Sequence, residues 1–196
     1  MKNIYKQFYS ITPPRPRFCI VCLLFFASTF CGDDMSVETY RVPRKSRNTA
    51  AHSARGGLRW TAPAGWRERS PSLMRLASYR VPGPTNDPAD DADAAIVVLG
   101  GDGGGLAANV NRWRNQIDLP PLAPGAVLRT ARTLRGAAGA FRWFAIKNPE
   151  LPGKAVWAAV LSTGRSTVFV KMTGPVRTLE KNQGKFLSLC KSIRSL

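Results

Sequence analysis

The sequence predicts an α+β fold in which a mostly antiparallel sheet has helices packed on both faces. Two apolar runs of strand length, residues 94–99 and 155–161, show no polar alternation, which is typical of strands buried on both faces. The connections between predicted strands have hairpin length, which favours antiparallel pairing because parallel strands need long crossovers. Only two long amphipathic segments, residues 106–117 and 176–193, are available to cover this sheet.

The first predicted strands are short. A strand at residues 58–60 is expected to turn at 61–65 and to return along 66–68, and a longer strand is expected over 74–81. Residues 87–93 are rich in aspartate and follow a break rich in proline and glycine, so they are predicted to form a polar loop.

The later strands carry most of the expected core. They are predicted over residues 94–99, 141–146, 155–161 and 167–173. The strand at 155–161 is expected to be central, because it is apolar on both sides. Residues 128–134 are a further candidate strand.

Two amphipathic helices are predicted. The first ends at Pro120 and Pro121, and its apolar stripe consists of Leu106, Val110, Trp113 and Ile117. The second begins after Pro175, and one face carries Val176, Leu179, Gln183, Phe186, Cys190 and Ile193. Gly184 weakens its middle by about 1 kcal/mol relative to alanine. Cys190 is expected to be a small core residue, and three tryptophans are also expected in the interior: Trp60, Trp113 and Trp157.

The N-terminal residues have the pattern of an export signal. Basic residues without acids precede an apolar run over residues 18–30, which ends at Cys31 and is shorter than the ~20 residues that span a bilayer. The pattern resembles a bacterial lipoprotein signal, so Cys31 is the candidate lipidation site. Phe30 is larger than the small residue that such signals carry before the cysteine. Cleavage near Ala27 or Ser28, and retention of the segment as an uncleaved anchor, therefore stay open as alternatives.

These segments divide the chain into three predicted parts. Residues 1–31 are the export signal with the candidate lipidation cysteine, residues 32–57 are a basic flexible tether, and residues 58–196 are a single compact α+β domain. We therefore expect an exported protein of the cell envelope, anchored to a membrane and facing the periplasm or the exterior.

The chain is strongly basic, with 29 Lys and Arg against 12 Asp and Glu and a formal net charge of +17. Its basic residues are spread along the chain rather than gathered in one run, and exported proteins rarely meet nucleic acid, so this pattern argues against a nucleic-acid partner. A membrane, a partner protein or an anionic envelope component is the expected partner.

No set of residues predicts catalysis, metal binding or a cofactor. The sole histidine, His52, lies in the predicted tether, which leaves the domain without a Ser-His-Asp triad or a Cys/His zinc cluster. The aspartates of residues 87–93 lack the spacing of a calcium loop. We therefore predict no catalytic residues, no metal and no cofactor.

The glycine-rich segment at residues 100–105, just before the first helix, is the main candidate binding feature. Free N–H groups at a helix N-terminus attract anions, and amide and guanidinium side chains follow on the helix. The candidate ligand-binding residues are Gly104, Gly105, Asn109, Arg112 and Gln116. The segment lacks the lysine of a P-loop, and Asp102 would repel a phosphate. A flexible strand-to-helix turn beside a solvated helix face is the alternative that the residues favour.

Four segments resemble, in the same order, segments of a family of uncharacterised bacterial envelope proteins: residues 60–66, 72–78, 103–116 and 168–175. The resemblance covers about residues 58–194. Many members of that family are assigned as lipoproteins, so the resemblance implies the same for this chain. The order of strands is similar to that of the PsbP-like fold, a central antiparallel sheet with helices on both faces. The resemblance implies a binding or assembly module and supplies no catalytic residues.

The expected function is a non-enzymatic, envelope-tethered domain that binds a ligand or assists assembly. The alternative is an envelope hydrolase or transferase whose site the sequence does not reveal. A pocket converging on buried acids with raised pKa values would indicate the enzyme, whereas a broad surface around the helix at residues 106–117 would indicate the binding module.

Mass spectrometry of the mature N-terminus is expected to find a lipid on Cys31, because the apolar run ends there. An unmodified Cys31 inside a longer chain, or a mature N-terminus near Ala27, would contradict the lipoprotein assignment and leave export unaffected.

Overall fold

The computed structural model describes residues 52–70, 72, 74–85 and 87–196. The strands are β1 (His52–Arg55), β2 (Leu58–Thr61), β3 (Arg67–Arg69), β4 (Ala77–Val81), β5 (Ala92–Gly100), β6 (Arg132–Gly136), β7 (Gly139–Lys147), β8 (Ala155–Ser162), β9 (Ser166–Gly174) and β10 (Arg194–Ser195). The helices are α1 (Leu106–Asn115), α2 (Pro124–Thr130), α3 (Val176–Lys181) and α4 (Gln183–Ser192), with a 3₁₀ helix at Pro88–Asp90.

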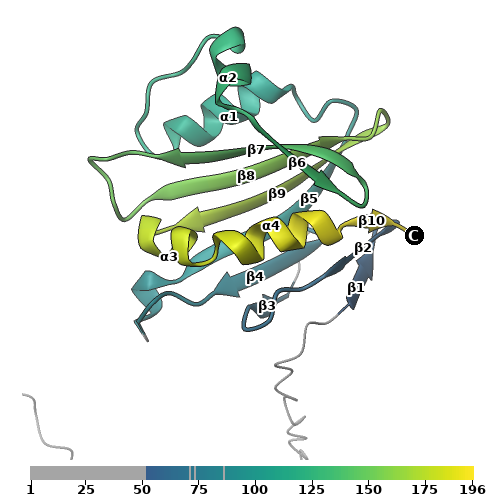
Figure 1. The fold of residues 1–196 in the computed structure, drawn as a ribbon, viewed down its shortest axis with the longest axis horizontal. Helices are drawn as coiled ribbons and strands as arrows, with labels where there is room; N and C mark the ends of the chain where they lie inside the picture. Colours follow the sequence, from purple (N-terminus) through teal and green to yellow (C-terminus); the bar gives the residue numbers. More distant parts are fainter. Residues whose placement is uncertain (1–51, 71, 73, 86) are drawn as a thin grey trace, which may run out of the picture. The chain divides into compact units, whose positions relative to one another are not determined.

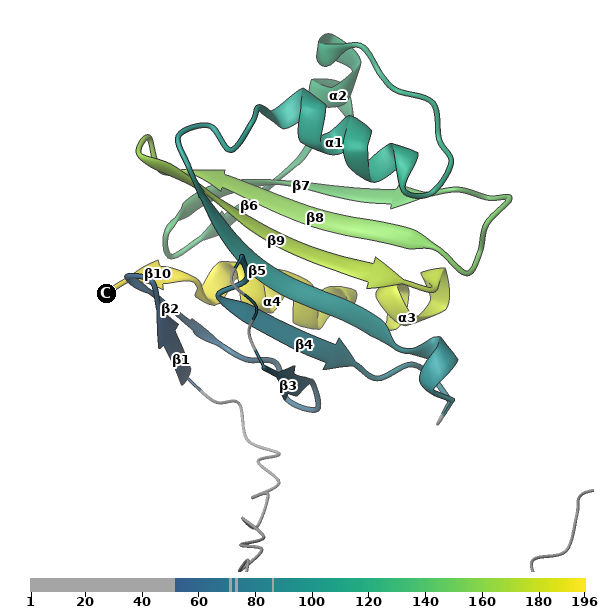
Figure 2. The same ribbon diagram turned by 180° about the vertical axis from the view of Figure 1, so that it is seen from behind.

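The main sheet has seven strands in the order β3-β4-β5-β9-β8-β7-β6, and each neighbouring pair is antiparallel (Figures 1 and 2). A separate three-stranded sheet has the order β1-β2-β10. The predicted α+β class, with a large antiparallel sheet and helices on both faces, is confirmed. Strand β8 was predicted to be central, and it is an internal strand beside β9, which occupies the middle place.

Strand β8 shows how both faces of the main sheet are buried. One set of alternate residues, which includes Trp157, belongs to the same apolar cluster as Phe186 of α4. The other set, which includes Val156, belongs to a second cluster with Val110 and Trp113 of α1. We call these two sides of the sheet the α4 face and the α1 face. Figure 1 shows α4 in front of the strands, and Figure 2 shows it behind them.

The three tryptophans predicted in the interior are buried, with exposed fractions of 1% for Trp60, 5% for Trp113 and 1% for Trp157. The indole N–H of Trp60 donates a hydrogen bond to the Tyr79 hydroxyl at 2.8 Å. Cys190 is fully buried in the α4-face cluster, and burial raises the pKa of its thiol. It is therefore a core residue, as its position on the apolar stripe predicts.

The segment before β6 differs from the predicted strand over residues 128–134. Residues 128–130 of that prediction lie in helix α2, whereas residues 132–134 lie in strand β6 as predicted. Pro124 occupies the first turn of α2, where the N–H that proline lacks would have no partner. Val127 of α2 is buried in the α1-face cluster. The Asn111 side chain exchanges two hydrogen bonds with the Leu122 backbone, each of 2.9 Å, which holds this segment against α1. Tertiary contacts with α1 therefore override the strand pattern.

The predicted C-terminal helix is divided into α3 and α4 at Asn182. Its backbone leaves the helical region, with φ −100° and ψ 7°, and its side chain is buried. The side-chain oxygen accepts from Trp66 Nε1 at 3.1 Å, and the amide nitrogen donates to the carbonyls of Thr178 and Pro82 at 3.0 and 3.3 Å. Gly184 lies in the first turn of α4, so the break falls just before the predicted weak point.

Helix α1 carries the predicted apolar stripe but ends at Asn115, before Pro120. Asp118 adopts a left-handed conformation with φ 56°, which turns the chain away from the helix before the prolines are reached. Ile117 lies beyond the helix and is still buried in the α1-face cluster.

The described fold begins at β1, inside the last part of the predicted tether at residues 32–57. Strand β1 pairs with β2, and β2 pairs on its other side with β10. The predicted hairpin between residues 58–60 and 66–68 is wrong, because β3 pairs with β4. Strand β2 lies in the separate small sheet, and its Trp60 packs in the α4-face cluster.

The segment predicted as an acidic loop at residues 87–93 contains a 3₁₀ helix and the start of β5. Asp93 lies in β5, and its carboxylate pairs with Arg75 at 2.8 Å. Asp90 is buried, and its carboxylate accepts hydrogen bonds from Thr85 and from Arg177 of α3. These aspartates therefore tie the segment to its neighbours.

Two of these carboxyls have lowered pKa values. Hydrogen bonds from the Thr85 hydroxyl and from Arg177 hold the pKa of Asp90 below its ordinary value of 3.8. Desolvation raises the pKa of Asp91, but the Gly83 N–H and Arg80 together outweigh this effect and leave the pKa lowered.

Trp113→Ala is expected to lower the free energy of unfolding by about 3–5 kcal/mol, because the buried ring would leave a cavity between α1 and the sheet. Urea unfolding followed by circular dichroism measures the loss. A variant of wild-type stability would contradict the buried position of this ring.

The free energy of unfolding is expected to fall in acid. A carboxyl whose folded pKa is lowered stabilises the fold above its ordinary pKa of 3.8, and this stabilisation is lost as the pH falls through the folded pKa. Asp90→Asn combined with Asp91→Asn should reduce the slope of stability against pH below about pH 5. Glu150→Gln, which changes an exposed acid, is the matched control. An unchanged slope in the double variant would exclude this role.

Candidate binding site beside the glycine loop

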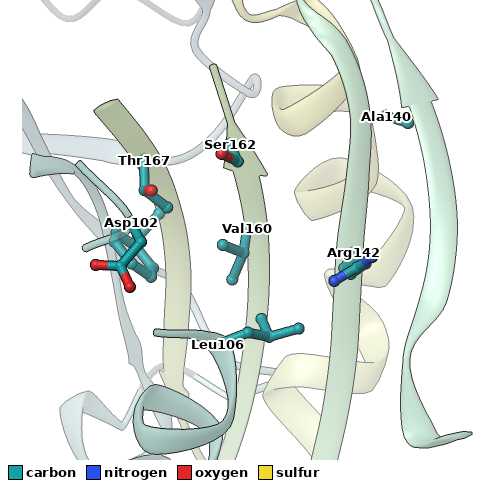
Figure 3. Close-up of a pocket in the computed structure, with 8 residues that line it drawn as sticks. Asp102, Leu106, Ala140, Arg142, Val160, Ser162 and Thr167 are labelled. Atoms are coloured by element: carbon teal, nitrogen blue, oxygen red, sulfur yellow. The ribbon is translucent and has the colours of Figure 1, made fainter. Parts of the chain in front are cut away.

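A hollow of about 310 Å³ lies on the α1 face of the sheet, beside the loop that precedes α1. Residues from that loop, from the start of α1 and from β7, β8 and β9 line it: Asp102, Leu106, Ala140, Arg142, Val160, Ser162, Thr167 and Phe169 (Figure 3). On β7, Phe144 and Ile146 belong to the buried α1-face cluster, whereas Arg142 and Ala140 on the same face are exposed. The hollow therefore opens where the buried cluster under α1 and α2 ends.

The floor of the hollow is a row of cross-strand neighbours. Arg142 of β7 lies opposite Val160 of β8, and Val160 lies opposite Phe169 of β9. The adjacent row places Ser162 opposite Thr167. The floor thus combines an apolar strip with one arginine at its side and two hydroxyl groups at one end.

The glycine loop forms the wall above β9. Gly103 has φ 64°, and a Cβ atom there would lie 2.6 Å from the Phe169 ring, so only glycine allows this close approach. The Thr167 hydroxyl donates to the Gly101 carbonyl at 2.9 Å. These contacts hold the loop against the sheet.

Three of the candidate residues form hydrogen bonds within the loop itself: Gly104, Gly105 and Asn109. The Gly104 and Gly105 N–H groups donate to Asp102, at its side-chain oxygen (2.9 Å) and its carbonyl (3.3 Å). The Asn109 amide is buried and donates to the carbonyls of Gly103 (2.9 Å) and Gly105 (2.8 Å). The N–H groups of Gly104 and Gly105 are therefore engaged within the loop.

The other two candidates, Arg112 of α1 and Gln116 just after its end, are exposed. Arg112 donates to the Asn109 side-chain oxygen at 3.0 Å, and Gln116 accepts from Lys171 at 3.2 Å. Neither residue lines the hollow, and neither do Gly104, Gly105 and Asn109. Cys31, the candidate lipidation site, lies outside the described residues.

Arg142 is not among the binding residues predicted from the sequence, although the sequence carries a signal for it. Alternation along β7 places Arg142 on the same face as Phe144 and Ile146, so it is the charged residue of an otherwise apolar face. No hydrogen bond or ion pair engages its guanidinium within the described part of the chain. The group is therefore available to a ligand.

The hollow offers two opposite charges and the Ser162 hydroxyl, while the Thr167 hydroxyl is engaged by the Gly101 carbonyl. Among residues 52–196, apart from the three left undescribed, no three His, Cys, Asp or Glu side chains gather as a metal site. Asp90 and Asp91 have lowered pKa values, whereas a buried catalytic acid would have a raised one. None of the described helices is long and apolar enough to cross a membrane.

A second hollow, of about 700 Å³, lies between the turn at residues 61–64 and the outer side of α4. Lys181 and Lys185 line it, and the Lys185 ammonium donates to the Ala64 carbonyl at 2.9 Å. Both lysines are exposed, and Lys185 is engaged by the turn.

No protein-family model matches the sequence, and the curated proteins include no match to it. The fold is similar to the solution structure of cyanobacterial PsbP (CyanoP) from Synechocystis sp. PCC 6803, with a TM-score of 0.45 and 10% identity over 80% of this chain and 98% of that one. It is also similar to a crystal structure from Bacteroides thetaiotaomicron VPI-5482, with a TM-score of 0.40 and 11% identity over 71% of this chain and 45% of that one.

Gly103→Ala is expected to lower the free energy of unfolding by about 2–4 kcal/mol, because the new methyl group meets Phe169 at a left-handed position. Gly100→Ala is the matched control, since a Cβ atom at Gly100 meets nothing within 4 Å. Thermal unfolding compares the two. Equal stability of both variants would contradict the close approach of the loop to the sheet.

Proposed function

We propose that this chain is an exported, membrane-tethered, non-enzymatic binding domain. Its hollow beside the glycine loop would bind a small ligand that carries an anionic group on an apolar body. The observation that carries the proposal is Arg142, a guanidinium without a partner in the described part of the chain, at the side of an apolar floor.

The residue types suit this ligand. A guanidinium presents parallel N–H donors that match a carboxylate or phosphate, and such charge-assisted bonds are stronger than neutral ones. Val160, Phe169 and Leu106 supply apolar surface, which contributes about 25 cal/mol for each Å² removed from water. Small-ligand sites commonly combine mostly apolar walls with a few placed polar groups.

The proposed location rests on the N-terminal pattern. An apolar run that ends at Cys31 would tether the domain to a membrane through a lipid or as an uncleaved anchor. The net charge of +17 would favour encounter with anionic ligands and anionic envelope components.

Binding can be tested by NMR titration of the full chain in detergent, with octanoate and octanol as matched ligands. Both ligands are kept at concentrations too low to form micelles with the detergent. Octanoate should bind more tightly than octanol, and the difference should shrink as salt rises. Arg142→Gln should weaken octanoate binding about fivefold to tenfold, because a charge-assisted hydrogen bond is lost.

Arg129→Gln is the matched control, because Arg129 is an exposed arginine of α2 that does not line the hollow. Unchanged octanoate affinity in Arg142→Gln, or an equal loss in Arg129→Gln, would contradict the proposed site.

A further inference from the structure

We propose that the ligand of this hollow is zwitterionic, with a carboxylate bound by Arg142 and an ammonium group bound by Asp102. The ligand class is that of amino carboxylates whose two charged groups are separated by an apolar spacer. This inference rests on the proposed function, because it names the ligand of the same hollow.

The first support is the construction of the glycine loop around Asp102. Asp102 is the one residue with a side chain between Gly100 and Leu106, and Gly101, Gly103 and the two glycines after it all have positive φ. Such a run of left-handed residues is accessible to glycine without strain. Asp102 is therefore the one side chain that this glycine-rich loop contributes to the wall of the hollow.

The second support is the state of the Asp102 carboxylate. One oxygen accepts the Gly104 N–H at 2.9 Å, which fixes the side chain within the loop. The side chain is exposed, and no cation pairs with it in the part of the chain that the structure describes. A fixed carboxylate without a cation can receive an ammonium group.

The third support is the arrangement of the two charges. Figure 3 shows Asp102 and Arg142 on opposite sides of Val160, with Leu106 below them. A plain anion bound at Arg142 would have a carboxylate on the other wall of the same hollow, which disfavours a second negative charge on the ligand. A positive group at that end of the ligand removes the conflict, and the apolar residues between the two charges match an alkyl spacer.

The competing explanation is that Asp102 only shapes the loop. Asparagine can accept the same Gly104 hydrogen bond through its side-chain oxygen, so Asp102→Asn keeps the turn and removes the charge. This substitution separates a structural role from a ligand-binding role. Asp102→Ser, which also supports such turns, serves as a second variant if the first is less stable in thermal unfolding.

The experiment compares ω-amino carboxylates of increasing length with the plain alkyl carboxylates of the same length, by NMR titration of the full chain. We expect one length of amino carboxylate to bind about 1.5-fold to fivefold more tightly than its plain counterpart, as one exposed ion pair contributes. Asp102→Asn should abolish this preference and leave plain carboxylates bound at least as well as in the wild type. Arg142→Gln should weaken both series.

Equal binding of the two series, or a preference that survives in both Asp102→Asn and Asp102→Ser, would overturn the zwitterionic ligand. If plain carboxylates still bind and Arg142→Gln still weakens their binding, the proposed binding function remains intact. Binding that is insensitive to Arg142→Gln in both series would overturn the proposed function together with this inference.

Discussion

The central strands of the main sheet are apolar on both faces, and this constraint governs the rest of the fold. Residues 155–161 of β8 are all buried, with Trp157 on the α4 face and Val156 on the α1 face. Each face must therefore be covered by separate elements. Helices α3 and α4 and strand β2 contribute to one cluster, while α1 and α2 contribute to the other.

The buried cluster on the α1 face stops short of one end of the strands, and the hollow lies there. Phe144 is buried within the cluster, whereas Arg142 on the same strand face is exposed beside the hollow. The glycine loop forms part of the wall because Gly103 lies against Phe169, which belongs to both the cluster and the hollow. The core and the candidate site thus share a side chain, so the position of the loop depends on the packing of the sheet.

Polar side chains join the elements on the other face. Asn182 divides the C-terminal helix and bonds to Trp66 and Pro82, while Asp90 bonds to Arg177 of α3. Asn182 and Asp90 are buried and bonded, so the segment that precedes β5 and the C-terminal helices hold each other in place. Removing one partner would leave a buried polar group unsatisfied, which costs more than the bond itself contributes.

The sequence by itself determined the class of fold, because local periodicity records which faces are apolar: the run at residues 94–99, β8 and the stripe around Trp113 all appear as predicted. Tertiary structure decided what local patterns do not encode. Helix α2 replaced part of a predicted strand because Val127 packs in the α1-face cluster, and β3 paired with β4 rather than β2. Tertiary structure also decided the candidate site. The N–H groups of the glycine loop are engaged by their neighbours, and the availability of Arg142 depends on where the covering helices end.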